Sequence, residues 1–178
     1  MRRLHKLIAR ETLALVLGTS DGTLTALTLG AGRLVGGGDS IDLELVVRIA
    51  LAATATGGFV LFVARYAELR RSLVHAERQL SMQSHLAATA LGRRVLVESV
   101  QAAAVAAAAT LGGAFLPLAI GVLASPATWT AIVAAIVELA VLGVLIARAV
   151  AGTPWRWASV MVASGFAMAM LGSVLHIT

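Results

Sequence analysis

Residues 13–29 read LALVLGTSDGTLTALTL, a stretch typical of a membrane-spanning helix except for one ionisable residue, Asp21. An aspartate at the centre of a membrane helix costs about 2.5–3.5 kcal/mol on insertion scales, so it normally faces a protein interior or a water-filled path. Its small and hydroxylated neighbours Gly18, Gly22, Thr23 and Thr25 permit close helix packing and offer hydrogen bonds. The stretch predicts a cation pathway at Asp21; the alternative is an interhelical hydrogen bond that only holds the helices together.

The composition of the whole chain identifies a membrane protein. Of its 178 residues, 59% are hydrophobic and 13% are charged, and the mean hydropathy is +0.91. Soluble domains average about 45–50% apolar and about 25% charged residues. The chain has no cysteine, which excludes disulfides, thiolate metal sites and cysteine nucleophiles. We interpret the net charge of +5 as a signal of membrane topology and expect no nucleic-acid partner.

Five hydrophobic runs are long enough to cross about 30 Å of hydrocarbon. Basic residues concentrate in the N-terminal tail and in the second and fourth connections, whereas the first connection is glycine-rich and acidic and the third has no basic residue. This alternation predicts an all-α membrane protein with its N-terminus inside and its C-terminus outside. No linker divides residues 1–178, so we expect a single domain. The predicted spans are Leu13–Val35, Leu43–Tyr66, Val95–Leu123, Trp129–Val150 and Trp157–Ile177.

The one sizeable polar segment, Ala67–Arg94, lies between the second and third spans. Leu69, Leu73 and Ala76 recur at helical spacing, with charged residues on the other faces. The segment predicts that the second span continues into the cytoplasm as an amphipathic helix. Its apolar stripe could pack against a partner subunit or lie on the lipid headgroups, where its arginines would meet anionic lipid.

Several short motifs resemble those of the vacuolar iron transporter family. The first span contains Gly18-Thr19-Ser20-Asp21-Gly22, which resembles that family's G-x-x-D-G signature, and residues 113–118, GAFLPL, are similar to its G-A-x-x-P-L. Tyr66 stands where the family has G-E-Y or G-G-Y. The chain looks like a divergent prokaryotic member. The resemblance implies a homodimer that exchanges Fe²⁺ or Mn²⁺ for protons along a path between the subunits.

In that family the first-span aspartate acts together with a methionine and a glutamate from the second span. Here Asp21 and Gly22 match, but the methionine position falls at about Leu61, the glutamate position near Ala53, and the glutamate of G-E-Y is Arg65. The family also collects metal on a glutamate-rich cytoplasmic helical domain. The resemblance reduces that domain here to two residues, Glu68 and Glu77. It therefore supports the fold more strongly than it supports iron.

Four further acids have a functional and a structural interpretation each. Glu138, in the middle of the fourth span, is the candidate proton carrier, or else it hydrogen-bonds a neighbouring helix. Glu98, near the start of the third span, could stand at the cytoplasmic entrance beside Asp21, or pair with Arg94. Glu68 and Glu77 could receive metal, or lie on a solvated helix face.

The spacing of small residues predicts where two copies meet. Gly18 and Gly22, like Gly32 and Gly36, form small-xxx-small pairs, which permit helices to approach closely. We expect the first spans of two protomers to form the dimer seam.

Sequence motifs of enzymes are absent: there is no Gly-x-Ser-x-Gly, His-Glu-x-x-His or Walker loop. The sequence predicts a non-enzymatic, proton-coupled transporter of a divalent metal cation, with a path at a dimer interface centred on Asp21. We expect the protein to form a homodimer, to contact membrane lipid and to have no permanently bound cofactor. Its expected location is a prokaryotic cell membrane. The alternatives are a non-transporting scaffold or a lipid- or partner-binding module that keeps the fold, and a transporter of a different ion.

Overall fold

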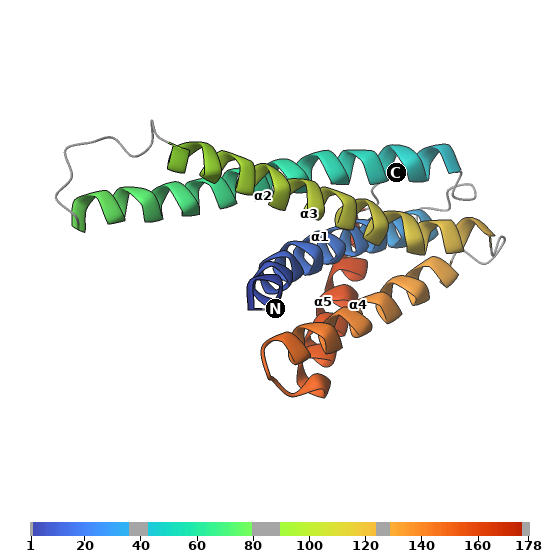
Figure 1. Ribbon diagram of the computed structural model, residues 1–178. Helices are drawn as coiled ribbons and strands as arrows, with labels where there is room; N and C mark the ends of the chain where they lie inside the picture. The colour runs from blue at the N-terminus through green and yellow to red at the C-terminus, as the bar shows by residue number, and fades with distance from the viewer. Residues whose placement is uncertain (1, 36–42, 80–89, 124–128, 176–178) are drawn as a thin grey trace.

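The computed structural model describes residues 2–35, 43–79, 90–123 and 129–175, and all of its regular structure is helical. The helices are α1 (Arg2–Val35), α2 (Leu43–Gln79), α3 (Ala90–Leu123), α4 (Trp129–Ala149) and α5 (Pro154–Leu175) (Figure 1). The predicted all-α class is confirmed.

Four of these helices, α2 to α5, are long and apolar enough to cross a membrane. Their surfaces carry large exposed side chains such as Phe59, Leu116, Val137 and Phe166, as expected for helices in contact with lipid. The architecture is therefore that of a multi-pass membrane protein. Helix α1 is not among the four found over the described residues, and threonines, glycines and Asp21 interrupt its apolar run. Its membrane crossing stays a prediction, as do the orientation of the chain and the dimer.

Helix α1 occupies the middle of the molecule. It contacts all four other helices, whereas α2 packs only on α3 and α1 among the described helices, and α5 only on α4 and α1. Figure 1 shows the result as two helical pairs, α2 with α3 and α4 with α5, on either side of α1. The residues of α1 therefore face two different helix pairs according to their position around the helix.

Glycines bring α1 and α3 into backbone contact. A Cβ atom placed on Gly18 would lie 2.3 Å from the Ala106 carbonyl oxygen, and one on Gly22 would lie 2.1 Å from that of Thr110. From the other side, a Cβ on Gly113 would lie 2.4 Å from the carbonyl oxygen of Thr19. This use of Gly18 and Gly22 corrects the expectation that they form a seam between two copies. Both glycines are already covered by α3 of the same chain, whose backbone packs directly against them. Gly36 lies outside the described residues.

Side chains fill the opposite contact, between α1 and the α4–α5 pair. Leu27 of α1 packs with Ala135, Leu139 and Leu142 of α4 in one buried cluster, against which Met161 of α5 is packed. Further along, Gly172 of α5 approaches α1 so closely that a Cβ there would lie 2.2 Å from the Thr28 carbonyl oxygen. Helix α1 is thus held on both sides.

Exposed arginines gather at three helix ends. In Figure 1 the C-terminal end of α2 and the N-terminal end of α3 lie at the left, and the turn between α4 and α5 lies at the bottom of the view. They carry the exposed residues Arg70, Arg71, Arg78, Arg93, Arg94, Arg148 and Arg156. Near the start of α2, Arg48 forms an ion pair with Glu44 of the same helix.

Candidate functional site

A cavity of about 310 Å³ lies beside Asp21, where α1, α2 and α3 meet. Polar groups from all three helices line it: Asp21 from α1, Thr56 from α2 and Thr110 from α3. Leu17, Val60 and Leu61 supply apolar walls, and Gly18, Gly57 and Ala106 complete the lining. Leu61, the residue at the family's methionine position, therefore faces this cavity as a hydrocarbon side chain.

Gly57 creates the space that the Asp21 carboxylate occupies. A Cβ atom on Gly57 would lie 2.9 Å from Oδ2 of Asp21 and 3.1 Å from Oγ1 of Thr110. The distance of 2.9 Å is shorter than almost any contact that a real Cβ atom makes, so a side chain at position 57 would displace the carboxylate. A carboxylate oxygen and a hydroxyl oxygen from two different helices thus converge on the bare backbone of a third.

The threonine hydroxyls of the cavity are oriented as acceptors. The hydroxyl of Thr110, which is fully buried, donates its hydrogen to the Ala106 carbonyl oxygen at 2.9 Å. That of Thr56 donates to the carbonyls of Ala52 and Ala53, at 3.0 Å each. Since a hydroxyl has one hydrogen and two lone pairs, the lone pairs remain available to a cation.

The Asp21 side chain lies at the surface of the chain, at the open side of the cavity. Its backbone carbonyl accepts a hydrogen bond of 2.9 Å from the hydroxyl of Thr25, one turn later on the same face of α1. The four residues predicted to line the path with Asp21 therefore have different surroundings. Gly18 lines the cavity, and Gly22 packs on α3. Thr25 lies next to Asp21, whereas Thr23 is not part of the cavity lining.

The donor atoms of the cavity are all oxygens. Carboxylate, hydroxyl and carbonyl oxygens suit hard cations such as Mg²⁺ and Mn²⁺, whereas thiolate, thioether and imidazole favour softer metals. Within the described part of the chain, no three His, Cys, Asp or Glu residues come together in a way that could hold a metal ion. One protomer therefore offers a single carboxylate, and a divalent cation would need water or a second protomer to complete its coordination.

Glu138 forms a second polar contact, on the other side of α1. Its half-buried carboxyl group lies close enough to the Thr23 side chain to interact with it, which links α4 to α1. The Thr23 hydroxyl also contacts the Thr19 carbonyl oxygen, at 2.8 Å, where it donates its hydrogen. Thr23 can turn its hydrogen to an ionised Glu138, or accept one from a protonated Glu138. The pair can thus hold either protonation state of the carboxyl group.

Asp21 and Thr23 point to opposite sides of α1. Two residues along an α-helix correspond to a rotation of about 200°. Asp21 consequently faces α2 and α3, while Thr23 and its partner Glu138 lie towards α4. Asp21 and Glu138 therefore occupy separate environments, and only α1 connects them.

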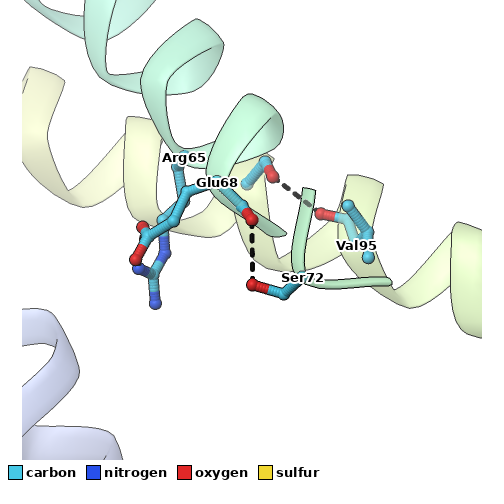
Figure 2. Close-up of polar contacts among 5 residues, drawn as sticks. Arg65, Glu68, Ser72 and Val95 are labelled. Carbon is cyan, nitrogen blue, oxygen red and sulfur yellow. Dashed lines mark hydrogen bonds and ion pairs between the residues drawn. The ribbon is translucent and has the colours of Figure 1, made fainter. Parts of the chain in front are cut away.

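Glu68, Glu77 and Glu98 do not join the cavity. Glu68 forms an ion pair with Arg65, with 2.6 Å between Oε2 and Nη1, and its carbonyl accepts a hydrogen bond from Ser72 (Figure 2). Glu77 lies more than two turns further along α2. Glu98 is exposed on α3 and lines a separate groove with Arg93 and Arg94. The predicted metal-collecting acids, Glu68 and Glu77, and the predicted entrance residue Glu98 therefore lie along the helices outside the cavity.

The sequence-based prediction did not single out Thr56, Gly57 or Thr110, the three residues of α2 and α3 that shape the site around the Asp21 carboxylate. Comparison of the chain with known proteins finds no matching family model, no matching curated protein and no matching solved structure. Function therefore has to be argued from the geometry of the site.

Proposed function

We propose that this protein transports a divalent metal cation across a prokaryotic cell membrane, with Asp21 as the central ligand. The observation that carries the proposal is the convergence of the Asp21 carboxylate with the hydroxyls of Thr56 and Thr110 around one cavity between three apolar-rich helices. An ionisable side chain within a membrane helix lowers stability, so it is normally kept for a function. Binding of a cation would be such a function for Asp21. The oxygen-only donor set favours Mn²⁺ or Mg²⁺, and Fe²⁺ is the cation that the motif resemblance adds.

The proposal includes a homodimer. Asp21 is exposed at the surface of the isolated chain, beside the exposed apolar side chains of Leu15 and Leu17. In a bilayer that surface would meet hydrocarbon, which cannot solvate a carboxylate. A second copy related by a twofold axis would cover it and bring a second Asp21 to the path. Two carboxylates with the hydroxyls and water form a plausible shell for one divalent cation.

Glu138 is proposed as the proton carrier of the exchange. Its contact with Thr23 accommodates both protonation states, and it lies apart from the cavity. A proton could bind there while the metal site is occupied. Coupling between the two sites would pass through α1, which carries Asp21 on one side and Thr23 on the other.

The test is uptake into proteoliposomes by the purified protein. Fe²⁺, Mn²⁺, Co²⁺, Zn²⁺ and Mg²⁺ are offered in turn, with a pH-sensitive dye inside the vesicles. Metal entry with proton movement is expected, strongest for a cation that prefers oxygen ligands. Asp21→Asn should lower metal affinity at least about tenfold, which corresponds to ~1.4 kcal/mol. Glu138→Gln should leave metal affinity within a few-fold and abolish proton movement.

The matched control is Glu44→Gln, which makes the same carboxylate-to-amide change at an exposed ion pair on α2 away from the cavity. It should transport like the wild type. Unchanged transport by Asp21→Asn would overturn the mechanism. No uptake of any of the five metals by folded, dimeric wild-type protein would instead favour a non-transporting membrane module.

A further inference from the structure

Helix α2 is longer than a membrane crossing requires. Its 37 residues correspond to about 55 Å of helix, against about 30 Å of hydrocarbon. Large exposed apolar side chains continue along it to Val63, and the exposed arginines Arg70, Arg71 and Arg78 follow. The boundary between hydrocarbon and water therefore crosses α2 close to Tyr66.

Three stacked side chains mark this boundary. The rings of Phe62 and Tyr66 lie 6.0 Å apart between centroids and are nearly parallel, with an angle of 15°. One turn further, Nη1 of Arg70 donates a hydrogen bond of 2.8 Å to the Tyr66 hydroxyl, and the guanidinium carbon lies 5.9 Å from the ring centroid. Apolar, amphipathic and cationic groups thus follow one another in the order of the layers of a bilayer surface. The guanidinium of Arg70 is held at headgroup depth.

An open groove of about 850 Å³ runs along the same face of α2. Its polar lining comes from Tyr66, Arg70, Arg71, Ser72, His75 and Arg78, and we call these residues the basic face. Neither Glu68 nor Glu77 is among the described residues that line it. Glu68 is engaged by Arg65. The described lining of the groove therefore presents three guanidinium groups, two hydroxyls and one imidazole, and no carboxylate.

We propose that the basic face binds the phosphate headgroup of an anionic phospholipid. The planar guanidinium forks of Arg70 and Arg71 match the geometry of phosphate oxygens, and the guanidinium of Arg78 lies further along the same groove. A membrane lipid fits better than a soluble anion, because the groove begins at the aromatic pair that sits at the bilayer surface. The lipid's acyl chains would run along the exposed apolar surface of α2, where Phe59 and Val63 lie. This site is independent of metal transport.

The test measures lipid binding by the full-length protein in detergent micelles, using native mass spectrometry. Short-chain phosphatidylglycerol is titrated against short-chain phosphatidylcholine, and glycerol phosphate is added as a soluble competitor. A basic residue near an anionic surface contributes about fivefold to binding. The wild type should bind phosphatidylglycerol at least tenfold more tightly than phosphatidylcholine, and glycerol phosphate should displace it poorly.

The Arg70→Gln/Arg71→Gln variant should lose most of this preference. The matched control is Arg148→Gln/Arg156→Gln, which removes two exposed arginines from α4 and α5, outside the groove, and should bind within twofold of the wild type. Tyr66→Phe removes only the hydroxyl that holds Arg70 and should weaken binding a few-fold, so it tests the site if the double variant fails to fold.

Three results would overturn the proposal. The first is equal binding of both lipids by the wild type, a result that can be obtained without any variant. The two double variants could lose affinity equally, which would show that general surface charge attracts the lipid. Glycerol phosphate could compete as well as the intact lipid, which would assign the groove to a soluble anion.

Discussion

Gly57 is the residue on which the cavity most directly depends. Its missing side chain leaves room for the Asp21 carboxylate, and a methyl group there would lie 2.9 Å from Oδ2. Gly57→Ala should therefore displace the carboxylate and reduce metal uptake at least several-fold. It should not unfold α2, because alanine is the better helix former by about 1 kcal/mol. Uptake and the thermal midpoint measured on the same preparation separate the two effects.

Gly112→Ala is the matched control for this substitution. Gly112 also lies in the interior of a membrane helix, but a Cβ atom there would meet nothing within 4 Å. It should transport like the wild type. If Gly57→Ala also keeps the wild-type rate, the position of the Asp21 carboxylate does not matter for transport.

Sequence alone leads to Asp21 but not to its surroundings. An acid in an apolar run is visible because its cost in a membrane is independent of the fold. Thr56 and Thr110 become notable only when α2 and α3 are placed against α1, because each hydroxyl bonds within its own helix and resembles many other threonines. Thr23 was expected beside Asp21, but helical rotation turns it towards Glu138.

At the scale of the helices, the contact between α1 and α3 depends on the absence of side chains. Gly22→Ala would place a Cβ 2.1 Å from the Thr110 carbonyl oxygen and 2.7 Å from the Ala114 nitrogen, both backbone atoms. The helices would have to separate, and overpacking of this kind costs about 1–3 kcal/mol. The thermal midpoint in detergent should fall, although alanine favours the helix.

Gly30→Ala provides the comparison on the same helix. A Cβ atom at Gly30 would meet nothing within 4 Å, so this variant should be as stable as the wild type or more so. Equal midpoints for the two variants would contradict the close backbone contact between α1 and α3.

The helices themselves were largely predictable, and their pairing was not. Hydropathy predicts five spans, since each must cover its own length of hydrocarbon. Four of them, α2 to α5, are long and apolar enough in the structure, and the first stays a prediction. The small-residue pair Gly18 and Gly22 correctly signals a close approach, but the signal does not name the partner. The sequence-based expectation was a second copy of α1, and the structure gives α3 of the same chain.

At the scale of the whole molecule, two helix pairs pack on two sides of α1, whose apolar run is interrupted by Asp21, threonines and glycines. The proposed transport would explain this division. The outer helices present apolar side chains to the lipid, and α1 carries the polar groups that would be costly in contact with hydrocarbon. Asp21 and Thr23, which interacts with Glu138 of α4, both belong to that inner helix.

The same division constrains how the chain is made. Helix α1 leaves the ribosome first, yet the surface that suits it best belongs to α3, which is complete only at Leu123. At a synthesis rate of about 5–20 residues per second, roughly 4 to 18 seconds pass between completion of α1 and completion of α3. In that interval α1 must be held by the insertion machinery or remain partly in water. Because the chain has no cysteine, a single Ala26→Cys, at a buried position of α1 that packs on Leu118 of α3, can report this without background. A water-soluble thiol reagent should label it in nascent chains halted after α2 and spare it in chains that include α3. Equal protection in both would mean that the bilayer accepts α1 on its own.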